Sequence, residues 1–377
     1  MKLVNTDLQT PCLVIDQNKL QQNISRMLSK CRSLNVQFRP HLKTAKCLDI
    51  ARLMDQSPTN GVTVSTLLEA EYFLDNGFDD VLYAVTIAPN KIEQALKLVA
   101  KHPEFKLLID NIEVCRQLAN ASQQQSLVTQ VLIEIDVDGH RAGLLPEQIE
   151  LSELACFIKD DPALKFKGLM THAGESYACR SKIEAHAHAE LEVSEMMKAV
   201  EHLKSIGITP EIISVGSTPT AQTMTKTAAV TELRAGVFVF NDLVMKNIGV
   251  CEIEDIALAV LATVISHKTS HNRVIIDAGG LALSKDRGTA GQQQDYGYGL
   301  IIDPETDTPI DNLIVNQANQ EHGVIQLIHS DQFAQLAIGK KLLILPNHAC
   351  MTAAAYEQYA VFTQGGNIQH WPRINGW

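Results

Sequence analysis

Short runs of β-branched residues alternate with longer helical patterns from about residue 34 to residue 242, and this alternation limits the fold more than any other feature. In the stretch KIEQALKLVAKH, for example, Ile92, Leu96 and Val99 fall on one face of a helix. The predicted strands are eight apolar runs, at 36–39, 61–64, 81–85, 105–109, 128–135, 165–170, 211–215 and 231–234. Eight strands with helical patterns between most of them predict a (β/α)8 barrel. A doubly wound sheet would carry a glycine-rich turn after its first strand, where this chain has RPHLK, so the barrel is favoured.

After residue 243 the chain becomes rich in β patterns separated by Gly, Asn, Asp and His turns. The apolar segments are 256–267, 272–280, 323–328 and 340–350. An early LVI run at 13–15 can add a strand to the same region before the chain enters the barrel. We therefore expect a barrel domain over 18–242 and a mainly β domain built from 1–17 and 243–377.

Charge and composition exclude several classes of partner. Lys and Arg number 32 against 43 Asp and Glu, a net charge of −11 that repels nucleic acid and anionic lipid. The longest apolar run, 256–265, is too short to span a bilayer, and the amino terminus does not read as a signal peptide. The eight cysteines show no CxxC spacing, which favours reduced thiols and a cytoplasmic location.

Polar residues follow several predicted strands, at the end of a barrel where active sites form. They are Arg39, His41, Lys43 and Lys46 after the first strand, Asp136, Asp138, His140 and Arg141 after the fifth, and Thr171, His172 and Tyr177 after the sixth. A lysine at a barrel mouth can form a Schiff base when its amine is desolvated, and Lys43 is in that position. Most lysines are simply exposed at the surface, so Lys43 needs a second feature to support it.

That second feature is a possible phosphate site after the seventh strand. Gly216, Ser217 and Thr218 offer backbone N–H groups and two hydroxyls that can hold a phosphate, although the same residues can equally cap the next helix. Gly236, after the eighth strand, can let a second backbone segment approach the same phosphate. An amine and an anion site on one rim are what pyridoxal phosphate requires.

A third candidate lies in the β domain, where PNHAC follows the apolar run KKLLIL. In an extended backbone, residues two apart point the same way, so the His348 imidazole and the Cys350 thiolate can share one metal ion. Two protein ligands leave positions open for substrate or water, as in a catalytic site. A buried cysteine beside a turn histidine is the alternative.

The motifs occur in the order TPCLVID, RPHLKTAK, DVDGHRAG, MTHAGESY, GSTPT, ELRAG, DAGG and PNHAC. In this order they resemble the fold-type III pyridoxal-phosphate enzymes of the D-serine dehydratase and D-threonine aldolase family, over nearly the whole chain. RPHLKTAK and PNHAC are the specific parts of the match. The resemblance implies an alanine-racemase-like (β/α)8 barrel joined to a C-terminal mainly β domain, usually in a head-to-tail homodimer with the cofactor near the interface.

The resemblance also implies roles for individual residues. Lys43 matches the family's Schiff-base lysine, and His348 with Cys350 matches its zinc pair, with another divalent metal still open. Our own hypothesis for the mechanism adds further cofactor-binding residues: Gly216, Ser217, Thr218 and the Gly236-Val237 backbone to anchor the phosphate, and Arg141, His172 and Tyr177 to orient the ring or the substrate. Arg141 can instead pair with a strand-end carboxylate, and Tyr177 can simply pack in a loop.

Dehydratases of this family typically carry His-x-Cys at the metal and D-threonine aldolases His-x-Asp, so Cys350 favours a dehydratase. The implied reaction converts a D-3-hydroxy amino acid, such as D-serine or D-threo-3-hydroxyaspartate, to a 2-keto acid and ammonia. Lys43 would remove the Cα proton, and zinc would help the β-hydroxyl leave. The alternatives are a retro-aldol cleavage to glycine and an aldehyde, an amino-acid racemase, a non-catalytic pyridoxal-phosphate carrier and a metal-binding structural protein.

Overall fold

The computed structural model describes residues 7–54, 61–139 and 141–377. The chain divides into two compact units, Arg26–Gly236 with Gly376–Trp377, and Met1–Ser25 with Val237–Asn375. We call them the barrel unit and the β unit. The division falls inside helix α1 (Gln17–Leu34) and at the Gly236-Val237 peptide, a few residues from the expected boundaries after residues 17 and 242.

The barrel unit is built on one sheet of eight parallel strands, in the order β2-β9-β8-β7-β6-β5-β4-β3. All eight predicted strands are present: β2 (Gln37–Pro40), β3 (Val62–Val64), β4 (Val81–Thr86), β5 (Lys106–Ile109), β6 (Thr129–Ile135), β7 (Leu164–Thr171), β8 (Ile212–Val215) and β9 (Glu232–Ala235). The first and last strands of this order, β2 and β3, meet at a single bridge between His41 and Thr63. The Leu42 N–H donates to the Thr63 carbonyl at 2.8 Å beside it, so the sheet closes as a barrel, as predicted.

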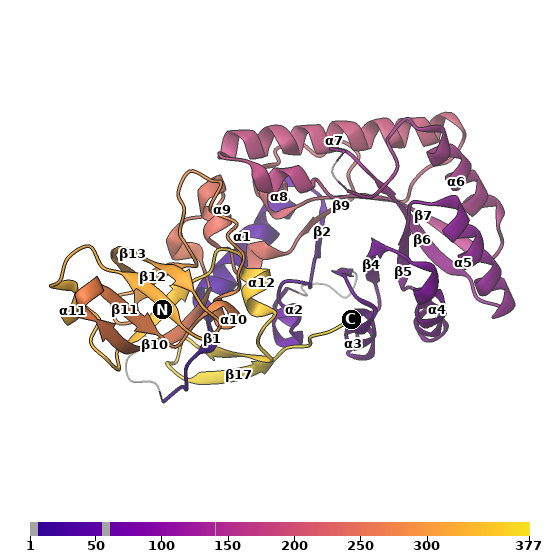
Figure 1. Cartoon of the computed structure of the whole chain (residues 1–377). Helices are drawn as coiled ribbons and strands as arrows, with labels where there is room; N and C mark the ends of the chain where they lie inside the picture. Colours follow the sequence, from indigo (N-terminus) through magenta and orange to yellow (C-terminus); the bar gives the residue numbers. More distant parts are fainter. Residues whose placement is uncertain (1–6, 55–60, 140) are drawn as a thin grey trace. The chain divides into compact units, whose positions relative to one another are not determined.

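Helices connect successive strands and lie on the outer side of the sheet (Figure 1). They are α2 (Leu48–Met54), α3 (Leu67–Asp75), η1 (Pro89–Lys91), α4 (Ile92–Lys101), α5 (Ile112–Gln124), α6 (Ile149–Asp160), η2 (Gly174–Ala178), α7 (Lys182–Ser205) and α8 (Thr218–Thr223). Helix α4 buries Ile92, Leu96 and Val99, the face that its spacing predicted.

The interior of the barrel combines an apolar layer with an ionic cluster in which Arg39, Lys106 and Glu232 are buried and Asp80 is partly exposed. Leu82, Leu108, Leu132 and Met170 pack together. The ionic cluster consists of Arg39, Asp80, Lys106 and Glu232. The Nε atom of Arg39 lies 2.8 Å from Glu232 Oε1, and its Nη2 lies 2.9 Å from Asp80 Oδ2. The expectation that Arg39 faces the active end was therefore wrong, because its side chain turns into the barrel interior, where only carboxylates can compensate its charge.

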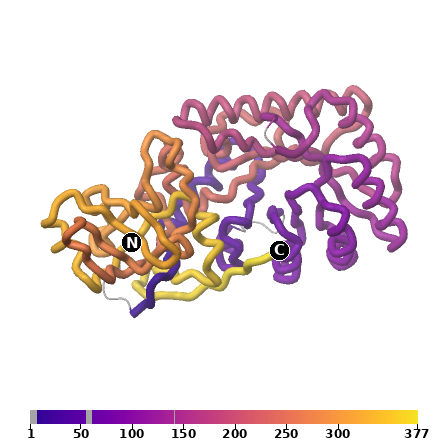
Figure 2. Tube along the Cα trace, viewed as in Figure 1, coloured from indigo at the N-terminus to yellow at the C-terminus, as the bar shows by residue number. Residues whose placement is uncertain are grey.

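The β unit contains one sheet of nine strands in the order β11-β14-β13-β12-β15-β10-β1-β16-β17, with an added pairing of β10 to β11. The strands are β1 (Cys12–Asp16), β10 (Leu258–Lys268), β11 (Arg273–Ile276), β12 (Leu300–Asp303), β13 (Thr308–Ala318), β14 (Gly323–Gln326), β15 (Lys341–Leu345), β16 (Gln358–Phe362) and β17 (Ile368–Pro372). The first strand pairs with β10 and β16, as the LVI run predicted; Figure 2 shows its indigo trace among the orange and yellow strands.

Short helical turns connect these strands. They are η3 (Val237–Val239), α9 (Leu243–Ile248), η4 (Ile253–Asp255), η5 (Thr269–His271), α10 (Gly280–Leu283), α11 (Gln332–Gln335) and α12 (Ala349–Ala353). Inside the unit, Leu261, Tyr296, Leu300 and Leu343 belong to one apolar core. Among the described residues, no helix has the length and apolar character needed to cross a membrane. All eight cysteines are described, and none of them forms a disulfide.

Candidate functional site

Lys43 lies in the turn that follows β2, and its side chain is half-buried. Its backbone N–H donates to Nδ1 of His41 at 3.4 Å, and Nε2 of His41 lies 3.3 Å from the Ser65 hydroxyl. Because Nδ1 accepts a hydrogen bond, the ring proton belongs on Nε2. His41 thus holds the backbone of Lys43 through one ring nitrogen and the β3–α3 turn through the other.

Two histidines next to Lys43 are held in the neutral form. Burial, followed by the charge of Lys43, lowers the pKa of His41 and that of His172 well below the usual value. The guanidinium of Arg234 adds to both shifts. The structure therefore brings the predicted residues Lys43 and His172 together, and it adds His41, which was noted in the sequence without a role.

His172 and Tyr177 both reach the turn between β8 and α8. Nδ1 of His172 lies 3.3 Å from the Gly216 carbonyl, to which it donates. The backbone N–H of Thr218 donates to the Tyr177 hydroxyl at 3.4 Å, and the ring centroids of His172 and Tyr177 are 6.0 Å apart. Four of the predicted cofactor-binding residues thus form one contiguous group at the carboxyl end of the sheet.

The side chain of Ser217 caps α8. Its hydroxyl lies 3.0 Å from the Thr220 hydroxyl and 2.7 Å from that of Ser176, and it accepts the Thr220 N–H as part of a capping box. The helix-cap alternative therefore describes the hydroxyl of Ser217, while its assignment as a cofactor-binding residue stays a prediction.

Two glycines let β9 approach its neighbours. Gly216 has a φ of +128°, and a Cβ atom there would lie 2.2 Å from the carbonyl oxygen of Arg234. At Gly236 a Cβ would lie 3.0 Å from the Thr44 hydroxyl and 3.2 Å from the His41 carbonyl oxygen. Glycine at 236 thus serves the contact with the turn that carries Lys43. Val237, the other half of the predicted phosphate-binding backbone, begins η3 of the β unit.

Arg141 is exposed after β6, and its positive charge acts on His172 and on Glu134. The pKa of Glu134 is raised by burial, while the Thr86 hydroxyl, which donates at 2.8 Å, works in the opposite direction. His140, which was noted with Arg141, lies outside the described residues.

In the β unit, His348 precedes α12 and Cys350 is the second residue of that helix. The backbone of His348 is extended, with φ of −135° and ψ of 103°, but that of Cys350 is helical, so the expectation of an extended pair holds for His348 alone. The two side chains still share a hydrogen bond. Nδ1 of His348 lies 2.8 Å from Oδ2 of Asp286, which leaves its other nitrogen for a different partner.

The electrostatics of this pair favour a bound cation. Burial lowers the pKa of His348, but hydrogen bonds with Asp286 and Cys350 outweigh it and raise the pKa to about 11. The hydrogen bond from His348 lowers the pKa of Asp286. Because a metal ion competes with protons for the same nitrogen and sulfur atoms, donors surrounded by negative charge also suit a divalent cation.

Two carboxylates near this pair were not found from the sequence. Asp286 supports His348 from 62 positions away, and Asp242 accepts the Ala349 N–H at 3.0 Å from 107 positions away. Asp242 is also the N-cap of α9, where it accepts the Met245 N–H at 3.0 Å. Only the tertiary fold brings these residues to the PNHAC segment, so no local pattern could have identified them.

Imidazole and thiolate are borderline-soft ligands of the kind that zinc prefers, so the residues present fit the implied ion. Across the described parts of the chain, no group of three or more His, Cys, Asp or Glu side chains could hold a metal. In the described β unit, the candidate donors are the pair His348 and Cys350, with the Asp286 carboxylate behind the imidazole.

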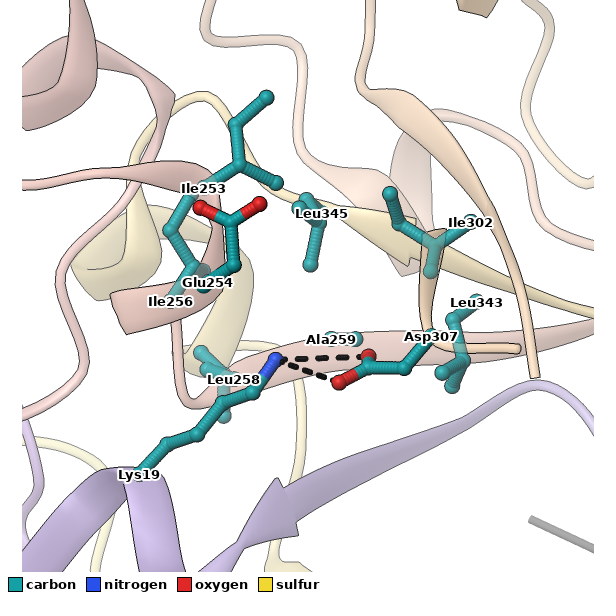
Figure 3. Close-up of a pocket in the computed structure, with 10 residues that line it drawn as sticks. All are labelled: Lys19, Ile253, Glu254, Ile256, Leu258, Ala259, Ile302, Asp307, Leu343 and Leu345. Atoms are coloured by element: carbon teal, nitrogen blue, oxygen red, sulfur yellow. Dashed lines mark hydrogen bonds and ion pairs between the residues drawn. The ribbon is translucent and has the colours of Figure 1, made fainter. Parts of the chain in front are cut away.

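The pocket drawn in Figure 3 lies on the β unit, and His348, Cys350 and Asp286 are not among its lining residues. Lys19 and Asp307 pair across it at 3.0 Å, and Glu254 lies on its wall. Its other walls are apolar side chains from η4, β10, β12 and β15 and the residues beside them. None of its described lining residues is a histidine or a cysteine.

Comparison with known proteins gives matches in both units of the chain. Residues 15–243 match the family model for the alanine racemase N-terminal domain, and residues 257–362 match a D-serine dehydratase domain. The chain is 41% identical to D-threo-3-hydroxyaspartate dehydratase of Delftia sp. over 98% of both chains. The chain belongs to the D-serine dehydratase and D-threonine aldolase family of fold-type III pyridoxal-phosphate enzymes.

Other members of this family show the same relation. The D-serine dehydratase of Dictyostelium discoideum is 30% identical over 97% of this chain and 98% of its own length. The solved structure of the Delftia sp. dehydratase matches with a TM-score of 0.95, 41% identity, and coverage of 98% of this chain and 99% of that chain. The D-threonine aldolase of Filomicrobium marinum matches with a TM-score of 0.83, 25% identity, and coverage of 97% and 95%. The predicted family, fold and enzyme class, a pyridoxal-phosphate-dependent lyase, are confirmed.

Proposed function

We propose that this protein is a dehydratase of D-3-hydroxy amino acids that converts D-threo-3-hydroxyaspartate or D-serine to a 2-keto acid and ammonia. The observation that carries the proposal is the His348-x-Cys350 pair with the Asp286 carboxylate behind the imidazole. Similarity to a D-threo-3-hydroxyaspartate dehydratase along 98% of both chains supports it.

Relatives also support the role of the metal. Two solved structures of variants of a D-threo-3-hydroxyaspartate dehydratase each match this chain with a TM-score of 0.95. One variant replaces a histidine with alanine, and the other replaces a cysteine two residues further along with alanine. The structure of the cysteine variant is that of a metal-free form. His348 and Cys350 have the same residue types and the same separation. We assign them as the ligands of a divalent cation, with zinc preferred for its affinity for thiolate.

The barrel unit offers what pyridoxal phosphate needs. Lys43 is half-buried, and its charge acts on two neutral imidazoles, those of His41 and His172. The charge of Arg234 acts on both imidazoles as well, and that of Arg141 on His172. When bound, pyridoxal phosphate supplies an electron sink for negative charge on Cα. Zinc, when bound, supplies Lewis acidity toward a hydroxyl oxygen.

The residues of the chain itself would transfer the proton and hold the two binding segments in place. Lys43 Nζ takes the Cα proton of the substrate, and neutral His41 keeps the turn that carries this lysine in place. His172 and Tyr177 hold the turn at Gly216–Thr218 in position, so that its backbone can face a phosphate. In the β unit, Asp286 and Asp242 hold the segment that carries His348 and Cys350.

A product assay tests the reaction. D-threo-3-hydroxyaspartate and D-serine are each incubated with the protein, pyridoxal phosphate and zinc, and 2-keto acid, ammonia and glycine are measured. We expect keto acid and ammonia in equal amounts. Glycine with an aldehyde would instead establish the aldolase, and the opposite enantiomer without keto acid would establish a racemase.

A second experiment tests the assignment of Lys43. The cofactor-loaded protein is reduced with borohydride, digested and examined by mass spectrometry. We expect the pyridoxyl group on the peptide that contains Lys43, and no labelled peptide in the Lys43→Ala variant. Lys198→Arg, a change in α7, is the matched control and should leave labelling intact. Labelling elsewhere in the wild-type protein would reject Lys43.

A homodimer and a cytoplasmic location complete the proposal. The family resemblance supports the first, and the spacing of the cysteines supports the second. Analytical ultracentrifugation at micromolar concentration measures the oligomeric state directly, and a particle with the mass of one chain would reject the homodimer.

A further inference from the structure

Beyond the two donors of the metal pair, we infer that Asp286 is the residue that positions His348 and tunes its affinity for the metal. This inference rests on the proposed function, because it concerns the ion that His348 and Cys350 are proposed to hold. Asp286 comes from the loop after α10 and has no place in the sequence motifs of the family match.

The hydrogen bond sets which ring nitrogen is available. An ionised carboxylate can only accept, so Asp286 Oδ2 at 2.8 Å requires a proton on Nδ1 of His348. The lone pair for a metal is then on Nε2, the nitrogen that Asp286 does not contact. A carboxylate behind a ligating imidazole fixes the orientation of the ring and makes the ligating nitrogen a better donor.

The loop that carries Asp286 is also hydrogen-bonded to the segment that carries His348 and Cys350. Asn347, the residue before His348, donates through its side-chain amide to the Asp286 carbonyl at 3.2 Å and to the Gly297 carbonyl at 2.7 Å. The oxygen of the same amide accepts from the Thr289 hydroxyl at 3.0 Å. Asn347 is 3% exposed, so this connection is buried. The relative position of Asp286 and His348 is therefore fixed by the hydrogen bonds of the Asn347 side chain as well as by their own hydrogen bond.

The test measures metal affinity, which does not depend on turnover. Zinc affinity is determined by competition with a chromophoric chelator, and cobalt is used as a second probe because a cobalt–thiolate bond absorbs light. We expect Asp286→Asn to weaken zinc binding roughly 10–100-fold, with the cobalt–thiolate absorption retained but requiring more metal. Asp286→Glu should recover part of the affinity, because it restores a carboxylate.

Two controls separate positioning from a general effect on the loop. Asp295→Asn removes a carboxylate of the same loop that pairs with Arg287 at 2.6 Å, and it should leave zinc affinity unchanged. In a double-mutant cycle, Asp286→Asn should cost no further affinity once His348 is replaced by alanine, since Asp286 acts through that imidazole. An independent loss in the His348→Ala background would overturn the inference even if the single variants behave as expected.

Failure of the inference and failure of the proposed function give different results. Wild-type protein that binds no zinc would reject the metal site and the inference together. Wild-type protein that binds zinc through Cys350, with equal affinity in Asp286→Asn, would reject the inference alone. If Asp286→Asn unfolds, the double-mutant cycle with Asp286→Glu decides the question, because this variant keeps the charge and changes only its position.

Discussion

Glu232→Gln is expected to destabilise the barrel unit strongly, because the glutamate carboxylate compensates a buried guanidinium. Glu232 and Arg39 are each 3% exposed, and both carboxylate oxygens lie 2.8 Å from Arg39 Nε. Glutamine keeps the size of the side chain and one acceptor, so the substitution removes mainly the charge. Asp80 is then the one carboxylate left in the ionic cluster for two cations, Arg39 and Lys106.

The size of the effect follows from the burial. Removing one partner of a buried ion pair costs about 3–5 kcal/mol, and since Asp80 still contacts Arg39 we expect the lower end, about 3 kcal/mol. With a urea dependence of about 3 kcal/mol per M, this corresponds to a midpoint lower by about 1 M. Urea unfolding is followed by circular dichroism, with the transition assigned to the barrel unit by proteolysis of partly unfolded samples.

Glu113→Gln is the matched control, because Glu113 pairs with Arg116 at 2.8 Å while both side chains are more than half exposed. It should leave the urea midpoint unchanged, since exposed ion pairs contribute little. The double variant Arg39→Met with Glu232→Leu should recover much of the loss, because no buried charge is left without its partner and Asp80 keeps Lys106. Equal midpoints for Glu232→Gln and Glu113→Gln would refute the reasoning.

Three further predictions concern acid, backbone and thiols. Burial raises the pKa of Asp80, but Arg39 and Lys106 outweigh it and lower the pKa overall, so its stabilisation is present above pH 3.8 and is lost as pH falls through the lowered folded-state value. Urea midpoints measured from pH 6 to pH 3 should therefore fall less steeply below pH 4 in Asp80→Asn than in wild type. Gly216→Ala should lower the thermal midpoint by several degrees, because alanine pays about 1–3 kcal/mol at a positive φ and its Cβ meets a neighbouring strand; an unchanged midpoint contradicts this. Titration with a disulfide reagent should show a fast-reacting thiol at exposed Cys156, which Cys156→Ser removes. A Cys156→Ser variant with as many fast-reacting thiols as wild type would contradict this prediction.

The sequence predicted the eight barrel strands because each is a short apolar run followed by a helical pattern, and local periodicity determines both. In the β unit, β1, β10, β11, β14 and β15 were also found from their apolar runs, whereas β12, β13, β16 and β17 were missed. The burial of β13 (Thr308–Ala318) alternates irregularly, and its register shifts between Val315 and Gln317, so it has no clean two-residue period.

The candidate site residues divide into those that lie in a local motif and those that only a tertiary contact reveals. Lys43 and His348 lie in local motifs, so the sequence alone proposes them. It does not propose Asp286, because the contact that defines this residue spans 62 positions. The sequence wrongly predicted Arg39 at the active end of the barrel, because the residues that follow it, such as His41 and Lys43, are polar. Only its tertiary partners Asp80 and Glu232 show that its side chain points into the barrel.

The sheet of the barrel is held together least between β2 and β3, and Lys43, the proposed cofactor lysine, lies just after this contact. The other neighbouring strands of this sheet pair over two or more residues, whereas β2 and β3 share, among the described residues, only the bridge at His41 and Thr63. Separating these two strands therefore breaks fewer backbone hydrogen bonds than separating any other neighbours in the ring. Separation of β2 from β3 would also displace Lys43. His41 forms the bridge to Thr63, and its ring accepts the backbone N–H of Lys43. A molecule that bonds to Lys43 only while these strands are paired is therefore expected to stabilise the closed barrel against unfolding.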